Sequence, residues 1–434
     1  MDMVHADAAT LDSALHDRQE WIERASRRWH LLLHGATLAF VVMLYSNPQF
    51  WWPSFEKFRL AFVAMGVGAL ALVMHRLTSG ERIRVGGRAA IPILLYLSFI
   101  PLSFAWTISV PDTRVATIEA AKMAIVFVVV QNAVDGPRRL RRFMLVGTLA
   151  ALGPALGAID VWRNDDALID GFRTHWRGAY ADPNRLAMAL IAVMPFALYG
   201  AVTARRRWAR LVFALTLAAQ LGAIVLTHSR SGFVAAGLAL ALFLFRGRTL
   251  TPPRKVAAAA VIALGIVAFA PATFWQRQAT IASYETDVSV AGRENAWKVL
   301  GVIMEERPFT GVGAAAFIQA WGRYAPLEAG GRRYIAHNLL LEIVGELGVV
   351  AFALFCGFAA WLLPKLWRAG SDPLVGTEAR AIFGALAGYL LIEMANGYSL
   401  SWFLYFLFAC ALVTIRLSRA RAALGRELPP WAAR

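Results

Sequence analysis

The chain has 434 residues, of which 58% are apolar and only 17% are charged, and its mean hydropathy is +0.53. This composition is too apolar for a soluble domain and indicates a membrane protein with many spans. The formal net charge of +16 would suit a nucleic-acid-binding protein, but the basic residues concentrate in alternate connections between apolar runs, which argues for membrane orientation and against nucleic acid.

Residues 1–30 mix acidic with basic side chains and lack a signal-peptide pattern, so we expect the first apolar run to remain as an anchor. Hydrophobic run lengths predict about twelve membrane spans. These spans cover approximately residues 31–46, 58–74, 89–106, 115–134, 143–161, 185–203, 211–227, 231–246, 256–272, 336–363, 379–396 and 401–416. Cys356 and Cys410 both fall in apolar runs, which indicates neither a disulfide framework nor a thiol metal site.

Arginines gather after alternate spans, for example in residues 138–142 and 205–210, and the positive-inside rule places these clusters and both termini in the cytoplasm. We therefore expect an all-α polytopic membrane protein. Its predicted parts are a cytoplasmic segment over residues 1–30, nine spans over 31–272, an outer loop with active-site elements over 273–335, three spans over 336–416 and a cytoplasmic tail over 417–434.

Several arginines break the charge bias because they lie on the outer side. They are Arg173, Arg177, Arg185, Arg230, Arg293, Arg332 and Arg333. Solvation of a polar loop is the simpler explanation for any one of them, above all for Arg332 and Arg333. A diphosphate ligand is the more specific explanation, because a guanidinium binds phosphate oxygens bidentately and stays charged at every relevant pH.

Local context separates these arginines. Arg230, in THSRSGF, lies in a short connection between two apolar spans, at the depth where a lipid diphosphate would sit. Arg185, in YADPNRLAM, follows a turn and helix-start signal in which Asp182 and Asn184 are expected to act as caps.

Arg293 opens the stretch GRENAWKVLGVIMEERP, in which apolar residues recur at helical spacing before Pro308. The recurring residues are Ala296, Val299, Leu300, Ile303 and Met304. This pattern predicts an amphipathic helix that lies on the membrane and directs Arg293 toward the bilayer surface. An ordinary snorkelling arginine is the alternative.

His337 stands where a long polar loop re-enters an apolar helix. Its imidazole can accept a proton near neutral pH, as a general base requires, and the alternative is a helix cap or a buried hydrogen bond. Glu342 and Glu346 follow on other faces of the same helix, so they are poor partners for His337, and helix-packing or proton-linked roles remain open. Glu119 and Lys122, three residues apart, predict a structural ion pair.

The chain contains no Walker loop, no Rossmann glycine pattern and no HExxH motif, which argues against ATP hydrolysis and zinc proteolysis. The outer acidic residues are scattered, with no carboxylate pair suited to a divalent cation. We therefore expect chemistry without a cofactor or a metal ion.

The segments DPNRLAM, THSRSG, RPFTGVGAAAF and AHNLLLEIVGELGVV occur in this order, and together they resemble the O-antigen ligase family of bacterial inner-membrane glycosyltransferases over roughly residues 175–365. The resemblance implies a GT-C-like fold, a glycan donor on undecaprenyl diphosphate, an acceptor hydroxyl on lipid A–core oligosaccharide, and transfer on the periplasmic side. It implies His337 as the general base. It also implies a diphosphate site made by Arg185, Arg230 and Arg293, with Asp182, Asn184 and Asn338 in support.

Other functions fit the same pattern. O-antigen polymerases and protein O-oligosaccharyltransferases of this family use the same class of donor, and a ligase is favoured because protein oligosaccharyltransferases commonly continue further after the last span. A solute or bicarbonate transporter could share the hydrophobic layout. A transporter is expected to carry polar groups at the midplane and repeated halves, whereas here the distinctive polar groups gather at one membrane face and no internal repeat is visible.

Overall fold

The computed structural model describes residues 2–247, 250–279, 288–325 and 333–427, and within these ranges the regular secondary structure consists of helices and one isolated antiparallel bridge between Ile169 and Arg173. The α-helices, in chain order, are α1 (Asp2–Ser46), α2 (Leu60–Ser79), α3 (Ile91–Leu102), α4 (Val110–Ala133), α5 (Pro137–Ala150), α6 (Leu152–Arg163), α7 (Pro183–Ile191), α8 (Met194–Thr203), α9 (Arg207–Leu226), α10 (Arg230–Arg246), α11 (Pro252–Phe269), α12 (Ala272–Ala279), α13 (Val288–Glu306), α14 (Phe317–Tyr324), α15 (Leu339–Ala369), α16 (Gly376–Glu393) and α17 (Trp402–Glu427).

In the described part of the chain, nine helical segments are long and apolar enough to cross a membrane. They are Arg18–Ser46, Leu60–Ser79, Gly87–Ala105, Pro137–Arg163, Pro183–Thr203, Arg207–Leu226, Pro252–Phe269, Leu339–Ala369 and Trp402–Ala422. The other three predicted spans coincide with α4, α10 and α16. The expectation of an all-α polytopic membrane protein is therefore confirmed.

Two of these segments each consist of two helices in series. The helix α5 gives way to α6 at Ala151, and α7 gives way to α8 near Val193. Pro195 stands in the first turn of α8, where its missing N–H has no helical partner to lose, whereas in the middle of a continuous helix it would break a hydrogen bond. The short helix α7 therefore begins and ends independently of α8.

The helices α10 and α16 pack closely against each other, and this packing fixes how they align along their lengths. A Cβ atom added at Gly384 would lie 2.5 Å from the Ala239 carbonyl oxygen, and one added at Gly388 would lie 2.9 Å from the Ala235 carbonyl oxygen. Small residues four apart let helix backbones approach closely in a membrane. Because the helices run in opposite directions, this register places the start of α10 level with the end of α16.

The helix α15 is interrupted at Gly348, whose φ of 77° and ψ of 178° are not helical. The interruption frees backbone groups, and the segment before α14 uses them: the N–H groups of Val312 and Gly313 donate to the carbonyls of residues 345 and 346 at 3.0 and 2.8 Å. Gly348 must be glycine here, because an added Cβ would lie 2.1 Å from the Phe309 carbonyl oxygen. The segment with the GVG sequence is therefore hydrogen-bonded to the GELG sequence of α15, and we call this contact the joint between α15 and the segment before α14.

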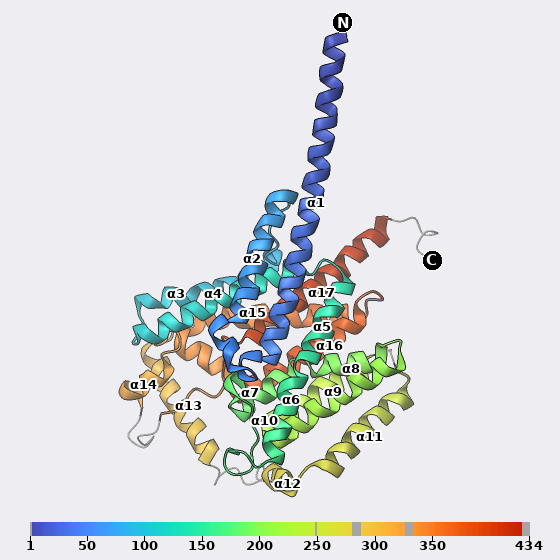
Figure 1. Ribbon diagram of the computed structural model, residues 1–434. Coiled ribbons are helices and arrows are strands. Elements are labelled where there is room, and N and C mark those ends of the chain that lie inside the picture. The colour runs from blue at the N-terminus through green and yellow to red at the C-terminus, as the bar shows by residue number, and fades with distance from the viewer. Residues whose placement is uncertain (1, 248–249, 280–287, 326–332, 428–434) are drawn as a thin grey trace.

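The helix α13 has the predicted amphipathic pattern but a different environment. Its apolar residues Ala296, Val299, Leu300 and Ile303 are buried in a cluster with residues of α14, such as Phe317. The expectation that this face lies on the membrane is therefore wrong, because neighbouring protein helices cover it. Figure 1 shows α13 and α14 along one side of the bundle near α15.

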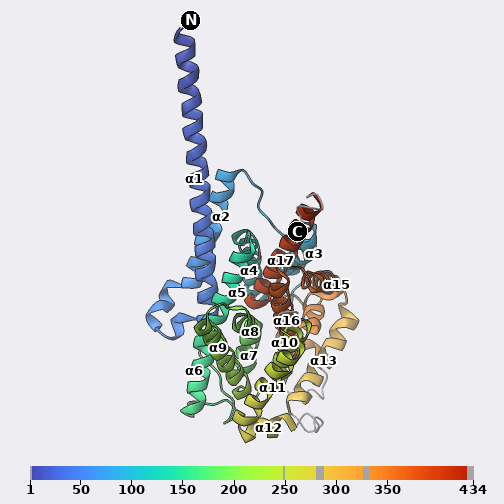
Figure 2. The same ribbon diagram turned by 90° about the vertical axis from the view of Figure 1, so that its right-hand side faces the viewer.

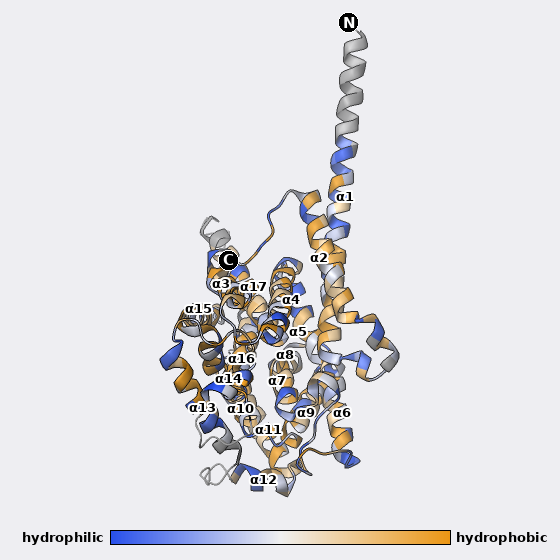
Figure 3. Cartoon of the chain, turned by 90° about the vertical axis from the view of Figure 1, so that its left-hand side faces the viewer, coloured by the Kyte–Doolittle hydropathy of each residue, from blue (hydrophilic) through white to orange (hydrophobic). Residues whose placement is uncertain are grey.

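The start of α1 and the end of α17 lie at the same end of the bundle, where the first part of α1 projects well beyond the other helices (Figures 1 and 2). The helix α12 lies at the opposite end. Apolar residues follow the bundle helices, and polar residues gather at helix ends and connections (Figure 3). An even number of membrane crossings accounts for termini on one side. The ion pair predicted between Glu119 and Lys122 is confirmed, with Nζ and Oε1 2.6 Å apart.

Candidate active site

The connection between α16 and α17, residues 394–401 with the sequence MANGYSLS, is the meeting point of the candidate site. Asn338 donates through Nδ2 to the Met394 carbonyl at 3.0 Å, and Arg293 donates through Nη2 to the Ala395 carbonyl at 3.2 Å. Arg293 thus points toward this loop and not toward the bilayer surface as expected, because the adjoining apolar face of α13 is covered by protein.

Arg185 reaches the 394–401 loop from the first turn of α7. Asp182 caps this helix as predicted, since its Oδ1 accepts hydrogen bonds from the backbone N–H groups of Asn184 and Arg185, both at 2.9 Å. The guanidinium carbon of Arg185 lies 4.9 Å from the centroid of the Tyr398 ring, within cation–π range. Arg185 is exposed, so its nitrogen atoms are accessible to a ligand.

Arg173 joins the DPNR segment to the THSRSG segment. Its Nε donates to the Thr227 carbonyl at 3.1 Å, its Nη2 donates to Asn184 Oδ1 at 3.2 Å, and its Nη1 lies 3.6 Å from a carboxylate oxygen of Asp170. Asn184 therefore lies inside the helix as an acceptor for Arg173, and Asp182 alone is the cap. Arg173, one of the outer arginines to which the sequence assigned no specific role, therefore connects these two segments through hydrogen bonds.

Arg230 is the first residue of α10 and is half-buried. Ser229 caps the helix, because its Oγ accepts a hydrogen bond from the Gly232 N–H at 3.1 Å. The register of α10 against α16 places Arg230 level with the start of the 394–401 loop. Arg332 lies outside the described residues, and Arg333 is exposed.

His337 precedes the N-cap of α15, with its backbone in the left-handed region at a φ of 51°. Asn338 is the cap: its Oδ1 accepts from the N–H groups of residues 340 and 341 at 3.0 and 3.2 Å. Burial lowers the pKa of His337 from 6.5, the positive charge of Arg293 lowers this pKa further, and Asp182 opposes them. The imidazole is thus neutral at pH 7 and able to accept a proton.

A second histidine has the same local backbone but a different environment. His228 precedes the cap of α10, its φ is 52°, and it is fully buried. Its Nδ1 lies 2.9 Å from the Leu226 carbonyl oxygen and its Nε2 lies 3.1 Å from Thr273 Oγ1. By contrast, no hydrogen bond joins the half-buried ring of His337 to any residue that the structure describes. His228 is therefore held by hydrogen bonds at both ring nitrogens, whereas the ring of His337 is available to bind an acceptor hydroxyl.

The two acidic residues of α15 hold backbone amides in place. Glu346 accepts from the N–H groups of Ala315 and Phe317 at 2.7 and 3.4 Å, next to the start of α14. Glu342 accepts from the N–H of Ser399 at 2.9 Å and so fastens the 394–401 loop. Of the roles left open by the sequence, these contacts favour packing.

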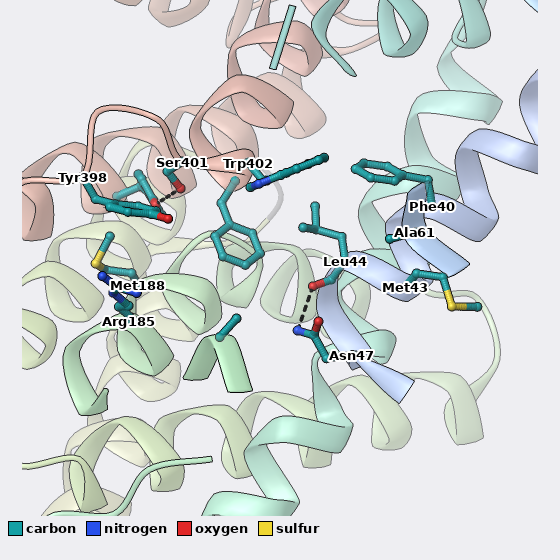
Figure 4. Close-up of a pocket in the computed structure, with 13 residues that line it drawn as sticks. Phe40, Met43, Leu44, Asn47, Ala61, Arg185, Met188, Tyr398, Ser401 and Trp402 are labelled. Carbon is teal, nitrogen blue, oxygen red and sulfur yellow. Dashed lines mark hydrogen bonds between the residues drawn. The ribbon is translucent and has the colours of Figure 1, made fainter. Parts of the chain in front are cut away.

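A cavity of about 240 Å³ opens beside Arg185 and Tyr398 (Figure 4). Its lining residues come from α1, α2, α7, α16, α17 and nearby loops, and they are Phe40, Met43, Leu44, Asn47, Ala61, Ala179, Arg185, Met188, Tyr389, Tyr398, Ser401, Trp402 and Phe403. Arg185 is the cationic member of an otherwise largely apolar wall. Figure 4 shows Arg185 and Tyr398 together at one end, with Phe40 and Met43 toward the other.

The structure thus brings together Arg185, Arg293 and Asn338 around the 394–401 loop, with His337 adjacent to Asn338. Sequence reasoning did not identify this loop, which contains no charged residue. A glycine and a tyrosine between two apolar spans, directly after the buried Glu393, were the available signal. Among the described residues, no three His, Cys, Asp or Glu side chains are grouped to hold a metal ion, and the metal-independent reaction stays a prediction.

Comparison with known proteins adds one finding. A family model described as O-antigen ligase matches residues 215–356. The matched range contains Arg230, Arg293 and His337, while Arg185 and Tyr398 lie on either side of it. No curated protein matches the chain.

Proposed function

We propose that this chain, in which residues 215–356 match a family model described as O-antigen ligase, transfers O-antigen polysaccharide from undecaprenyl diphosphate to a sugar hydroxyl of lipid A–core oligosaccharide. The reaction takes place on the periplasmic face of the inner membrane. It needs no metal ion or cofactor, and it inverts the anomeric configuration of the transferred sugar.

One observation carries this proposal: the 394–401 loop is contacted by Arg185, by Arg293 and by Asn338, the neighbour of His337. Cationic side chains suited to a diphosphate thus lie near an available imidazole, although they come from distant parts of the chain. The cavity beside Arg185 supports the same assignment, because its largely apolar wall suits the isoprenoid that adjoins a lipid diphosphate.

In the proposed step, the neutral His337 imidazole takes the proton of the acceptor hydroxyl while the hydroxyl oxygen attacks the anomeric carbon of the donor. The bond between this carbon and the diphosphate oxygen breaks, and its electron pair stays on the leaving diphosphate. Arg185, Arg230 and Arg293 stabilise the growing negative charge. A single displacement without a covalent intermediate accounts for inversion, and the activated donor supplies the free energy.

The test uses purified protein in liposomes with a glycan on undecaprenyl diphosphate and lipid A–core acceptor, in the presence of EDTA. We expect glycan on the acceptor with inverted configuration and free undecaprenyl diphosphate in equal amount. A strict requirement for added divalent cation would contradict the metal-independent mechanism.

The same assay separates the competing functions. Lengthening of the lipid-linked glycan without use of the core acceptor would identify a polymerase, and transfer to a protein hydroxyl would identify a protein O-oligosaccharyltransferase. Absence of any transfer together with solute uptake into the liposomes would identify a transporter. In a deletion strain, a ligase predicts core without O-antigen and accumulation of lipid-linked polymer.

A further inference from the structure

The Arg185 side chain is exposed, so folding alone does not hold its guanidinium in one orientation. Its one described ring contact is with Tyr398, whose centroid lies 4.9 Å from the guanidinium carbon. Both side chains line the same cavity, at the same end (Figure 4). A ring in this position can orient a guanidinium while leaving its N–H groups available for another ligand.

Tyr398 is itself held by the loop on which it lies. The N–H of Ser399 donates to Glu342 Oε1 at 2.9 Å. Gly397, at a φ of 72°, packs so closely that an added Cβ would lie 3.0 Å from the backbone nitrogen of Asn338. Contacts on both sides of Tyr398 thus tie its backbone to the first turn of α15, which carries the cap next to His337.

The protonation state of Tyr398 suits this contact. Burial raises the pKa of the phenol, against the opposing effect of the Arg185 charge, so the ring is neutral at pH 7. A neutral ring presents its electron-rich face to a cation and does not form an ion pair with it. Tyr398 as a whole residue is 40% exposed and lines the cavity with Arg185, which keeps one side of the Arg185–Tyr398 pair open to a ligand.

We propose that Tyr398 is a positioning residue for the donor: its ring orients the Arg185 guanidinium toward a phosphate of the lipid-linked donor. This inference rests on the proposed function. It assigns a role to a residue outside the range of the family match. It also links the diphosphate site, through the 394–401 loop, to the first turn of α15 next to His337.

The experiment compares Tyr398→Leu, which removes the ring, with Tyr398→Phe, which removes only the hydroxyl. We expect Tyr398→Leu to raise the KM for undecaprenyl-diphosphate-linked glycan by about 5- to 30-fold, the range of a partly desolvated cation–π contact, with the acceptor KM unchanged. Tyr398→Phe should keep the wild-type donor KM. Trp162→Leu, at an exposed aromatic residue on α6, is the matched control and should have no effect.

A double-mutant cycle distinguishes positioning from a general structural role. In an Arg185→Ala background, Tyr398→Leu should raise the donor KM no further, because the ring then has no guanidinium to orient. Additive effects, or a donor KM in Tyr398→Phe as high as in Tyr398→Leu, would overturn the proposal. So would a wild-type donor KM in Tyr398→Leu.

Two controls keep the result interpretable. Each variant is checked by gel filtration and thermal melting, and Tyr398→Met replaces Tyr398→Leu if the latter does not fold. If wild-type protein itself shows no donor-dependent transfer, the proposed function fails. If the wild type transfers glycan but the ring variants behave as wild type, only the inference about Tyr398 fails.

Discussion

His337 and His228 share a left-handed backbone directly before a helix cap, yet their rings are placed for different tasks. Both ring nitrogens of His228 have partners in the described structure, whereas the ring of His337 is half-buried beside Arg293 and Asp182. Strained backbone at a functional residue persists only when its surroundings hold it, and here the Asn338 cap does so. The residue type alone does not distinguish the two histidines.

The pKa of His337 sets the expected pH dependence of transfer. Burial and the Arg293 charge lower this pKa below 6.5, so the base is neutral at pH 7 and is lost only as the pH falls through the lowered value. We expect kcat/KM, measured between about pH 5 and 8, to decrease as the pH is lowered, with a midpoint below pH 6.5. Arg293→Ala should shift this midpoint upward, and an unchanged midpoint would argue against the charge effect.

Replacing His337 by alanine should remove the acidic limb of this profile and lower kcat by about a hundredfold to ten-thousandfold, the usual contribution of a general base. Donor binding should be kept, since the imidazole is assigned to the acceptor hydroxyl. His228→Ala is the comparison, with an expected effect on thermal stability. Near-normal turnover in His337→Ala would leave this histidine a structural residue.

The arginines allow a charge-matched series. We expect Arg230→Ala and Arg293→Ala each to raise the donor KM by about tenfold to a hundredfold, as for loss of a hydrogen bond to a charged group. Lysine at either position should restore only part of the affinity, because it keeps the charge but lacks the bidentate fork. Arg333→Ala, at an exposed loop position, is the control. Full activity in both site variants would dismiss the diphosphate site.

At the scale of elements, the joint between α15 and the segment before α14 explains why glycines recur in the GVG and GELG sequences. The interruption at Gly348 exposes backbone carbonyls that the N–H groups of Val312 and Gly313 satisfy. Glu346 adds a carboxylate acceptor for the Ala315 N–H at the same place. The segment before α14 is thus fixed to α15 between two and three helical turns after His337.

Gly348→Ala tests this joint. A non-glycine residue at a φ of 77° and ψ of 178° costs about 1–3 kcal/mol, and the added methyl group also meets the Phe309 carbonyl, so we expect a lower melting temperature in detergent. Gly357 lies in the same helix with nothing near its Cβ position, and Gly357→Ala should leave stability unchanged or raise it by about 0.5–1 kcal/mol. Equal effects of the two variants would contradict the joint.

At the scale of the whole molecule, the start of α1 and the end of α17 lie at the same end of the bundle, which agrees with the common cytoplasmic side that the charge bias predicts for them (Figures 1 and 2). The connection after α6, near Asn164, is then expected in the periplasm. The connections after α2 and α15 are expected in the cytoplasm.

Single cysteines in a background without Cys356 and Cys410 test this orientation. Asn164→Cys should react with an impermeant thiol reagent in intact spheroplasts, while Arg82→Cys and Ser371→Cys should react only after lysis. All three positions are exposed, so access depends on the side of the membrane and not on burial. The reverse labelling pattern would move the candidate site to the cytoplasm.

By itself, the sequence determined the helical class, the approximate positions of the apolar helices and the helix starts near Asp182 and His337. These are local properties: hydrophobic run length, cap residues and arginine clusters act over a few turns, so a linear sequence displays them. The amphipathic pattern of α13 was equally visible. The sequence did not show what this apolar face packs against, because such a face fits a bilayer or a neighbouring helix equally well.

Only the tertiary structure decided which residues meet. The uncharged 394–401 loop became the centre of the site because the glycine-mediated packing of α10 on α16 and the contacts of Asn338, Glu342 and Arg293 converge there. Such long-range contacts depend on packing geometry between distant helices, which no local pattern encodes. The same reason explains why His228 and His337, alike in their local backbone, were distinguished only by what packs against their rings.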